Sequence, residues 1–311
     1  NDIIAGKNTI FTYQPKTSIP RYHQDIAIIP ISEGCLFSCT YCITKKARGI
    51  LRSYPLNEIT DDVHKIVKKG CKEIRITAQD TASYGQDIKS SLPLLINEIS
   101  KINGDFMVRI GMMNPASAEK ILTELLNVYF SDKIFKFLHL PVQSGSDAIL
   151  KNMGRKYTIK RYTDIIESFR ELFPDITIST DIIVAFPGET ERQFRLSCQL
   201  LATIQPDIVN ITRFSARPGT IAKTMDERIT TDLAKKRSQK MTALVKEISR
   251  KKNDEKIGNK YRVLAIEKRH EYMMGRTINY KPVLFKGGKI GEWVNIEIKK
   301  ATQTHLIGKI Y

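Results

Sequence analysis

Three cysteines stand close together near the start of the chain, in the stretch GCLFSCTYC. Cys35, Cys39 and Cys42 are separated by three and by two residues. A structural zinc site takes four ligands, usually as two close pairs, and no fourth cysteine or histidine follows at that spacing. A cubane iron–sulfur cluster held by three thiolates instead leaves one iron without a protein ligand, and that open position can bind a chelating molecule. The polar, glycine-led loop also disfavours three ordinary core cysteines, so the spacing predicts a cluster.

The other two cysteines and the hydropathy pattern indicate a reducing compartment. Cys71 and Cys198 lie on separate predicted elements, which does not fit a disulfide framework. No apolar run approaches the roughly 18 residues of a membrane-spanning helix, and no signal sequence opens the chain. We therefore expect a cytoplasmic location and no membrane partner.

The charge of the chain points to a large anionic partner. The formal net charge is +17, and clustered Lys and Arg gain free energy by displacing the counterions of phosphates. Residues 228–260 alone hold eleven Lys or Arg against four acidic residues. A polyanion such as a nucleic acid is the expected partner, and a strongly solvated surface is the alternative explanation.

The elements that must position the cysteines form a repeating pattern of strand and helix. Short apolar runs alternate with amphipathic segments six times, which predicts a parallel sheet closed or partly closed into a (β/α)6 barrel. The predicted strands are residues 26–31, 72–77, 106–112, 133–140, 176–186 and 207–214. In such barrels the chemistry lies on the loops after the strands. The cysteine loop occupies this position after the first strand.

The pattern changes after Thr220. One long basic helix is predicted over about 230–252, and it is followed by short alternating strands typical of a small antiparallel β-barrel. We expect three segments: residues 1–24 as a connecting stretch, residues 25–252 as the α/β core with its basic helix, and residues 253–311 as the small barrel.

Five stretches in order carry a resemblance to a known family. CLFSCTYC resembles the cluster motif of the radical S-adenosylmethionine superfamily, with Tyr41 as its aromatic residue. The wider set resembles the tRNA methylthiotransferases, in particular the archaeal and eukaryotic threonylcarbamoyladenosine branch, and the tail resembles their RNA-binding TRAM domain. The stretches are GCLFSCTYCITKKARG, TAQDTASYG, HLPVQSGSD, TDIIVAFPGET and RFSARPGT.

This resemblance implies roles for the cysteines and their neighbours. Cys35, Cys39 and Cys42 would bind one 4Fe-4S cluster, whose free iron takes the amino and carboxylate groups of S-adenosylmethionine. One electron from an electron donor then cleaves a carbon–sulfur bond and yields a 5'-deoxyadenosyl radical. Tyr41 would lie against the adenine of the cofactor.

Further cofactor contacts are implied at the ends of later strands. Gln79 and Asp80 would hold the methionine part of the cofactor, and Gln143, Ser144 and Asp181 would contact its ribose or adenine. A polar residue at a strand end can equally cap a neighbouring helix, and this alternative stays open for Ser144 and Asp181. No catalytic residue beyond these is assigned.

The chain departs from the family pattern in two places. Ala185 stands where the family usually has glycine, which is tolerable if the backbone angle there is ordinary. The family also carries a preceding domain with three further cysteines, which bind a second cluster that delivers sulfur. We expect this chain to be a fragment or processed form that lacks this domain, cleaves its cofactor and does not complete sulfur insertion.

The implied activity is addition of a methylthio group to carbon 2 of N6-threonylcarbamoyladenosine, next to the anticodon of tRNA. Alternatives are isopentenyladenosine or a ribosomal protein as the substrate, or a non-catalytic, cluster-containing RNA-binding module. Basic residues expected to contact the anticodon stem-loop are Lys45, Lys46, Arg48, Arg52, Lys268, Arg269, Lys281, Lys286 and Lys289. The oligomeric state is left open.

Overall fold

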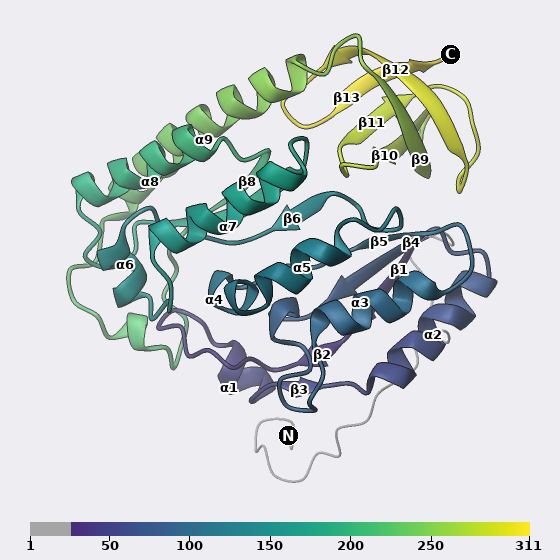
Figure 1. Ribbon diagram of the computed structural model, residues 1–311. Helices are drawn as coiled ribbons and strands as arrows, with labels where there is room; N and C mark the ends of the chain where they lie inside the picture. The colour runs from purple at the N-terminus through teal and green to yellow at the C-terminus, as the bar shows by residue number, and fades with distance from the viewer. Residues whose placement is uncertain (1–25) are drawn as a thin grey trace. The chain divides into compact units, whose positions relative to one another are not determined.

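The computed structural model in Figure 1 describes residues 26–311. The chain folds into two compact units. The first comprises the described residues up to Ile134 together with Ala216–Thr224, and the second comprises Phe135–Ser215 and Met225–Tyr311. The expected connecting segment 1–24 lies outside the described residues. No helix within residues 26–311 is both long enough and apolar enough to cross a membrane.

The first unit is built on a three-stranded parallel sheet. Its order is β1 (Ile26–Pro30), β4 (Glu73–Thr77) and β5 (Met107–Arg109). A two-stranded antiparallel ribbon, β2 (Ser32–Glu33) and β3 (Arg52–Ser53), flanks the loop that carries the cysteines. The helices are α1 (Thr44–Arg48), α2 (Leu56–Lys68), η3 (Thr81–Ser83), α3 (Leu92–Lys101), α4 (Pro115–Ala118), η4 (Glu119–Ile121), α5 (Leu122–Val128) and η5 (Ile221–Lys223).

The second unit repeats the arrangement and adds a barrel. Its parallel sheet has the order β6 (Phe137–His139), β7 (Thr177–Val184) and β8 (Ile208–Arg213). The helices are α6 (Asp147–Asn152), α7 (Ile159–Leu172), α8 (Glu191–Ile204) and α9 (Thr231–Asp254). The long helix α9 packs on α8 and β8 and leads into the C-terminal barrel (Figure 1).

The predicted alternation of six strands with helices is confirmed, but the third and fourth strands are shorter than predicted. The hydrogen-bonded part of β5 ends at Arg109, and that of β6 begins at Phe137. Ile110 and Phe135 are nonetheless buried, at 1% and 0% exposure. Apolar runs overestimate strand length here because they report burial, which continues past the last ladder hydrogen bond.

The C-terminal residues form a closed five-stranded barrel in the order β10-β11-β13-β12-β9. These strands are β9 (Lys260–Arg269), β10 (Tyr272–Thr277), β11 (Pro282–Phe285), β12 (Trp293–Ala301) and β13 (Leu306–Ile310). The predicted small antiparallel barrel is confirmed, with one difference: β11 and β13 pair in parallel, while the other four pairs are antiparallel. A closed barrel with an odd number of strands must contain at least one parallel pair. Its core gathers Val263, Val283, Phe285, Ile296 and Ile298.

The barrel is joined to the rest of the second unit by packing and backbone contacts. The ring of Tyr280 lies with its centroid 4.8 Å from that of Phe135 and 5.0 Å from that of Phe137. The amide of Lys136 donates to the carbonyl of Ile278 at 2.8 Å. Removal of the barrel would therefore expose core residues of the second unit.

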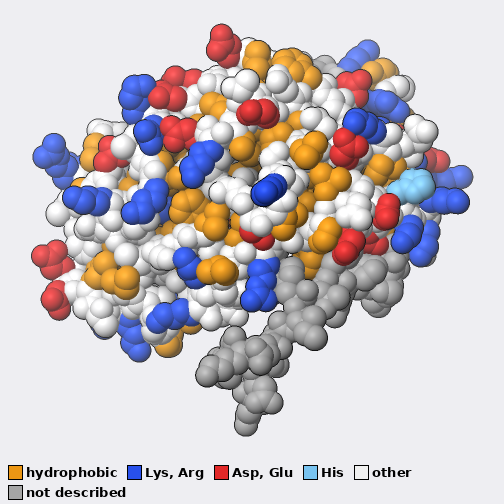
Figure 2. All heavy atoms as spheres, turned by 60° about the horizontal axis from the view of Figure 1, so that its bottom comes forward, with side chains coloured by type: hydrophobic (Ala, Val, Ile, Leu, Met, Phe, Trp, Pro, Cys, Tyr) orange, Lys and Arg blue, Asp and Glu red, His pale blue; other side chains and the backbone are white. Residues whose placement is uncertain are grey.

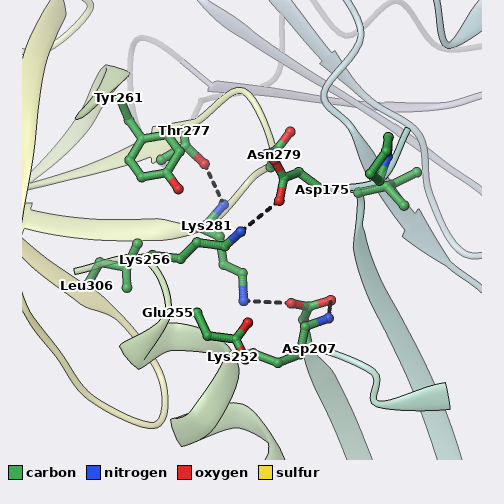
Figure 3. Close-up of a pocket in the computed structure, with 12 residues that line it drawn as sticks. Asp175, Asp207, Lys252, Glu255, Lys256, Tyr261, Thr277, Asn279, Lys281 and Leu306 are labelled. Atoms are coloured by element: carbon green, nitrogen blue, oxygen red, sulfur yellow. Dashed lines mark hydrogen bonds and ion pairs between the residues drawn. The ribbon is translucent and has the colours of Figure 1, made fainter. Parts of the chain in front are cut away.

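An ion-pair cluster at the same junction centres on Asp207 (Figure 3). Its buried carboxylate accepts hydrogen bonds from Lys281 Nζ at 2.7 Å, from Lys252 Nζ at 2.9 Å and from the amide of Ile178 at 2.9 Å. Lys281 also donates to Asn253 at 2.9 Å. Burial alone would raise the pKa of Asp207, but the two ammonium groups hold it below its ordinary value.

A pocket of about 130 Å³ opens beside this cluster. Asp175 at its rim is 69% exposed and pairs with Lys256 at 2.7 Å. The lining holds three lysines and three acidic residues, so their formal charges cancel. The pocket is therefore the solvated edge of the junction between the barrel and the rest of the second unit, and its neutral lining does not favour binding of an anion.

The turn after β7 holds its backbone in an unusual conformation. Ala185 has φ of +62°, in the left-handed region. Alanine was expected to be tolerable in place of glycine here only if this backbone angle was ordinary, and it is not. Its amide donates to the buried carboxylate of Glu189 at 2.9 Å, and Arg237 of α9 pairs with the same carboxylate at 2.9 Å. Gly188 has φ of +75° in the same turn. The side-chain network thus fixes a backbone shape that glycine adopts more easily.

Replacing Asp207 with Asn should destabilise the second unit strongly. The change leaves the buried ammonium group of Lys281 and the partly buried one of Lys252 without a counter-charge, which costs about 3–5 kcal/mol. Because the folded pKa of Asp207 lies below the unfolded value near 3.9, its ion-pair stabilisation is present above about pH 4 and is lost as the pH falls through the folded pKa. Urea unfolding between pH 7 and pH 3 should show this loss of stability in the parent and a smaller loss in the Asp207→Asn variant.

Asp175→Asn, at the exposed rim of the pocket, is the control and should change stability by less than about 1 kcal/mol. Equal effects of the two variants would contradict the assignment.

Ala185→Gly should raise stability slightly. A left-handed alanine costs about 1–2 kcal/mol, while added glycine in the unfolded chain costs about 0.5–1 kcal/mol, so a net gain of about 0.5–1 kcal/mol is expected. The matched change Gly188→Ala should lower stability by about 1 kcal/mol, because its Cβ would also lie 3.0 Å from Glu227. Both are measured by thermal unfolding. A destabilised Ala185→Gly variant would show that the methyl group packs favourably.

Candidate functional site

The cysteine loop is held in a tight fold between β2 and α1. Gly34 has φ of +74°, and a Cβ there would lie 2.1 Å from the carbonyl oxygen of Ile50, so only glycine fits. The amide of Cys35 donates to Gly49 at 3.2 Å, and that of Cys42 donates to Cys39 at 3.0 Å. Cys35 and Cys39 are partly buried, and Cys42 is exposed. These contacts bring all three predicted cysteines onto one small loop.

The thiols influence one another electrostatically, although they do not converge on one point. The pKa of the Cys35 thiol is raised, first by burial and then by the charges of Asp80, Cys39 and Cys42. The thiol of Cys42 donates to Thr44 Oγ1 at 3.1 Å. Within residues 26–311, no three His, Cys, Asp or Glu side chains are gathered closely enough to hold a metal ion as they stand. Three thiols on one exposed loop fit a cluster as a donor set, and binding would require them to turn inward and lose their protons.

Cys71 and Cys198 belong to other elements of the chain than this loop, as predicted. Cys71 is buried just before β4, and its thiol donates to the carbonyl of Glu73 at 3.4 Å. Cys198 lies on α8 in the second unit.

A later stretch of the chain packs against the cysteine loop. The amide of Ala222 donates to the carbonyl of Thr40 at 2.8 Å, and Lys46 Nζ donates to the carbonyl of Gly219. Residues 216–224 belong to the first unit for this reason, although they follow β8 in sequence. The RFSARPGT stretch thus helps to hold the backbone on which the three cysteines sit.

Gln79 and Asp80 follow β4 and have different surroundings. The Oε1 atom of Gln79 is buried without a hydrogen-bond partner among the described residues, which suits a donor group on a ligand. The carboxylate of Asp80 instead accepts bonds from the amide of Asn114 at 2.9 Å, from Ser117 Oγ at 2.7 Å and from Ser83 Oγ. Asp80 therefore organises the loops after β4 and β5, and its direct contact with a cofactor stays a prediction.

Gln143 and Ser144 lie in the second unit after β6. Gln143 has φ of +73°, and its amide donates to the carbonyl of Asp181 at 2.8 Å. A non-glycine residue held in this region marks a constrained loop of the kind that clusters at functional sites. Ser144 is fully buried, and its hydroxyl accepts from the amide of Ser146 at 3.3 Å, at the start of α6. This contact is a local turn of two residues before α6, which has no side-chain cap, so the role of Ser144 stays a prediction.

Asp181 sits at the centre of a polar cluster that spans three strands. His139 Nε2 of β6 lies 3.1 Å from its carboxylate, and Asn210 of β8 donates to it at 2.7 Å. Burial would raise the pKa of Asp181, but the hydrogen bonds and charges of its partners hold it below the ordinary value. His139 and Asn210 were not singled out from the sequence. The sequence does show at least one polar residue in each of these three strands. Only the order of the strands in the sheet shows that the three residues are neighbours.

The predicted phosphate contacts stay predictions, except that of Lys281. Lys45 donates to the carbonyl of Leu36 and to Ser38 in the cysteine loop, each at 3.2 Å, and Lys281 is only 8% exposed in the Asp207 cluster. The inclusion of Lys281 among exposed RNA contacts was therefore wrong. Figure 2 shows Lys and Arg side chains interspersed with Asp and Glu on the face in view.

Comparison with known proteins places the chain in a family. Residues 29–201 match the radical SAM superfamily, and residues 235–311 match the TRAM domain. Two solved structures share the fold at 15% identity: a radical S-adenosylmethionine methyltransferase from Kitasatospora setae (TM-score 0.52, covering 63% of this chain and 38% of the other) and coproporphyrinogen III oxidase from Escherichia coli (TM-score 0.53, covering 73% and 53%).

Two curated relatives are closer in sequence. A probable threonylcarbamoyladenosine tRNA methylthiotransferase of Archaeoglobus fulgidus is 46% identical over 92% of this chain and 67% of its own length. The Drosophila melanogaster threonylcarbamoyladenosine tRNA methylthiotransferase is 38% identical over 94% of this chain and 54% of its own length. The chain therefore belongs to the radical SAM superfamily and, within it, to the family of threonylcarbamoyladenosine tRNA methylthiotransferases.

Proposed function

We propose that this protein adds a methylthio group to carbon 2 of N6-threonylcarbamoyladenosine next to the anticodon of tRNA. The observation that carries the proposal is a three-cysteine loop of radical SAM type in a chain 46% identical to an archaeal relative named for this reaction. The TRAM match and the net charge of +17 support an RNA substrate.

Different residues of the chain hold the cluster and S-adenosylmethionine. Cys35, Cys39 and Cys42 bind a 4Fe-4S cluster, on the loop fixed by Gly34 and by residues 216–224. When bound, the cluster and S-adenosylmethionine supply one-electron cleavage of a carbon–sulfur bond. The buried Oε1 of Gln79 would accept a hydrogen bond from the amino group of the cofactor. Tyr41 would lie against its adenine.

The remaining predicted contacts form a second set. Gln143, Ser144 and Asp181 orient the ribose or adenine, with His139 and Asn210 fixing the Asp181 carboxylate. Residues 25–252 act as the catalytic core and residues 253–311 as the RNA-binding part. The anticodon stem-loop is the bound element, an electron donor supplies the electron, and the cytoplasm is the site of action.

The sulfur atom requires a source besides S-adenosylmethionine. We propose a second cluster, held by residues other than these 311, as the family resemblance implies. Cys71 and Cys198 are isolated thiols on different compact units, and two such thiols make a poor site for a cluster.

Substitution of the three loop cysteines should remove the cluster. Cys35→Ala, Cys39→Ala or Cys42→Ala should each lose most of about four irons after anaerobic reconstitution and should abolish formation of 5'-deoxyadenosine. Cys71→Ala and Cys198→Ala are the matched controls and should keep both. Iron and sulfide analysis with electron paramagnetic resonance measures the first quantity. Four irons retained in the triple variant would sink the cluster assignment, and a cluster without 5'-deoxyadenosine would favour a non-catalytic RNA-binding module.

Loss of the gene should change one tRNA nucleoside. Mass spectrometry of digested tRNA from a deletion strain should show N6-threonylcarbamoyladenosine without its methylthio form. The wild-type gene should restore the product, and a Cys39→Ala gene should not. A change confined to isopentenyladenosine, or to a ribosomal protein, would replace the proposed substrate with that alternative.

A further inference from the structure

Two aromatic rings on the C-terminal barrel each carry a cation over their face. The guanidinium carbon of Arg262 lies 4.7 Å from the ring centroid of Trp293, and Lys260 Nζ lies 4.4 Å from that of Tyr311. Trp293 is partly buried, and Tyr311 is 59% exposed. Both cations are exposed.

These four residues lie on neighbouring strands and on one side of the barrel wall. In the antiparallel pair β9–β12, Arg262 stands opposite Asn295 and Lys260 stands opposite Glu297. The amide of Tyr311 donates to the carbonyl of Asn295 at 3.3 Å, which places Tyr311 beside the same rows. The intervening residues Val263 and Ile296 are fully buried in the barrel core. Alternation along the strands therefore turns Lys260, Arg262 and Asn295 away from the core.

The charge of this surface favours an anionic partner. Glu297 is the acidic residue within the paired rows, and it is bonded to Lys299 at 2.6 Å. Arg262 lies over the ring of Trp293, and Lys260 lies over the ring of Tyr311 and near the charge of Glu297, which Lys299 also neutralises. A phosphate can therefore draw both cations away at little cost. A cation over an aromatic ring contributes only about 0.5–1 kcal/mol at an exposed site.

Aromatic rings paired with mobile cations suit unpaired nucleotides. Bases of a single strand offer their faces for stacking, while bases in a duplex are already stacked on their neighbours. We propose that Lys260, Arg262, Trp293 and Tyr311, here called the stacking face, bind unpaired bases of the RNA substrate. The rings receive the bases, and Lys260 and Arg262 move to the adjoining phosphates. This inference rests on the proposed function for the identity of the RNA.

The sequence supplies its own probe for the test, because Trp293 is the only tryptophan in the chain. The reconstituted protein is titrated with an anticodon stem-loop and with a fully paired RNA of equal length. Trp293 fluorescence should be quenched by the stem-loop, and the duplex should have little effect. Labelled-RNA anisotropy should show Tyr311→Ala and Arg262→Gln weakening stem-loop binding at least about fivefold, with little change for the duplex.

Tyr272→Ala is the matched control. This tyrosine of β10 also carries a cation, Lys286, at 5.1 Å, but Lys286 is paired with Glu271 and the residue lies outside the stacking face. Its variant should bind the stem-loop like the parent. Thermal unfolding of each variant checks that the barrel is folded.

Equal affinity for the stem-loop and the duplex, or unchanged stem-loop binding by Tyr311→Ala and Arg262→Gln, would overturn the stacking face. These results are separable from the proposed function. Methylthiolated tRNA with normal binding by the face variants would reject only the stacking face. Quenching and weakened variants in a protein whose deletion leaves the tRNA unchanged would reject only the proposed function.

Discussion

The buried carboxylate of Asp207 joins three parts of the second unit that are far apart in sequence. It accepts bonds from β7, from the end of α9 and from the turn between β10 and β11. A charge taken out of water is costly unless donors surround it, so each of these parts is held in place by the others. The small barrel is consequently an integral part of its unit, and its outer strands are presented from a fixed support.

Asp80 does in the first unit what Asp207 does in the second. Its carboxylate collects donors from the loops after β4 and β5, and its charge contributes to raising the pKa of Cys35. The loops that carry chemistry are thus shaped by a buried acid behind them. This arrangement explains how short loops beside the cysteines keep one conformation without a core of their own.

Two non-glycine residues after parallel strands of the second unit have backbones held in the left-handed region. Gln143 in the loop after β6 and Ala185 directly after β7 both hold positive φ angles, at the ends of parallel strands where ligands bind in sheets of this kind. Hydrogen bonds to Asp181 and Glu189 maintain these angles. Strain of this size persists only where surrounding contacts overdetermine the chain, which is consistent with a preorganised binding rim.

Local patterns in the sequence determined the repeating strands and helices, the C-terminal barrel and the three-cysteine loop. They could do so because burial of an apolar face and the spacing of ligands are properties of neighbouring residues. The same patterns overestimated the lengths of β5 and β6 and predicted that Lys281 contacts RNA. They failed there because periodicity carries no information about hydrogen-bond partners that are distant in sequence.

Only the tertiary structure decided which polar residues meet. The pairing of Asp181 with His139 and Asn210, and the enclosure of Lys281 by Asp207, depend on sheet register and on packing between segments about 30 to 75 residues apart. The parallel pair in the barrel likewise follows from closure and not from any strand's own sequence. Residue types and local spacing therefore identified the chemistry, while register and closure fixed the partners of each side chain.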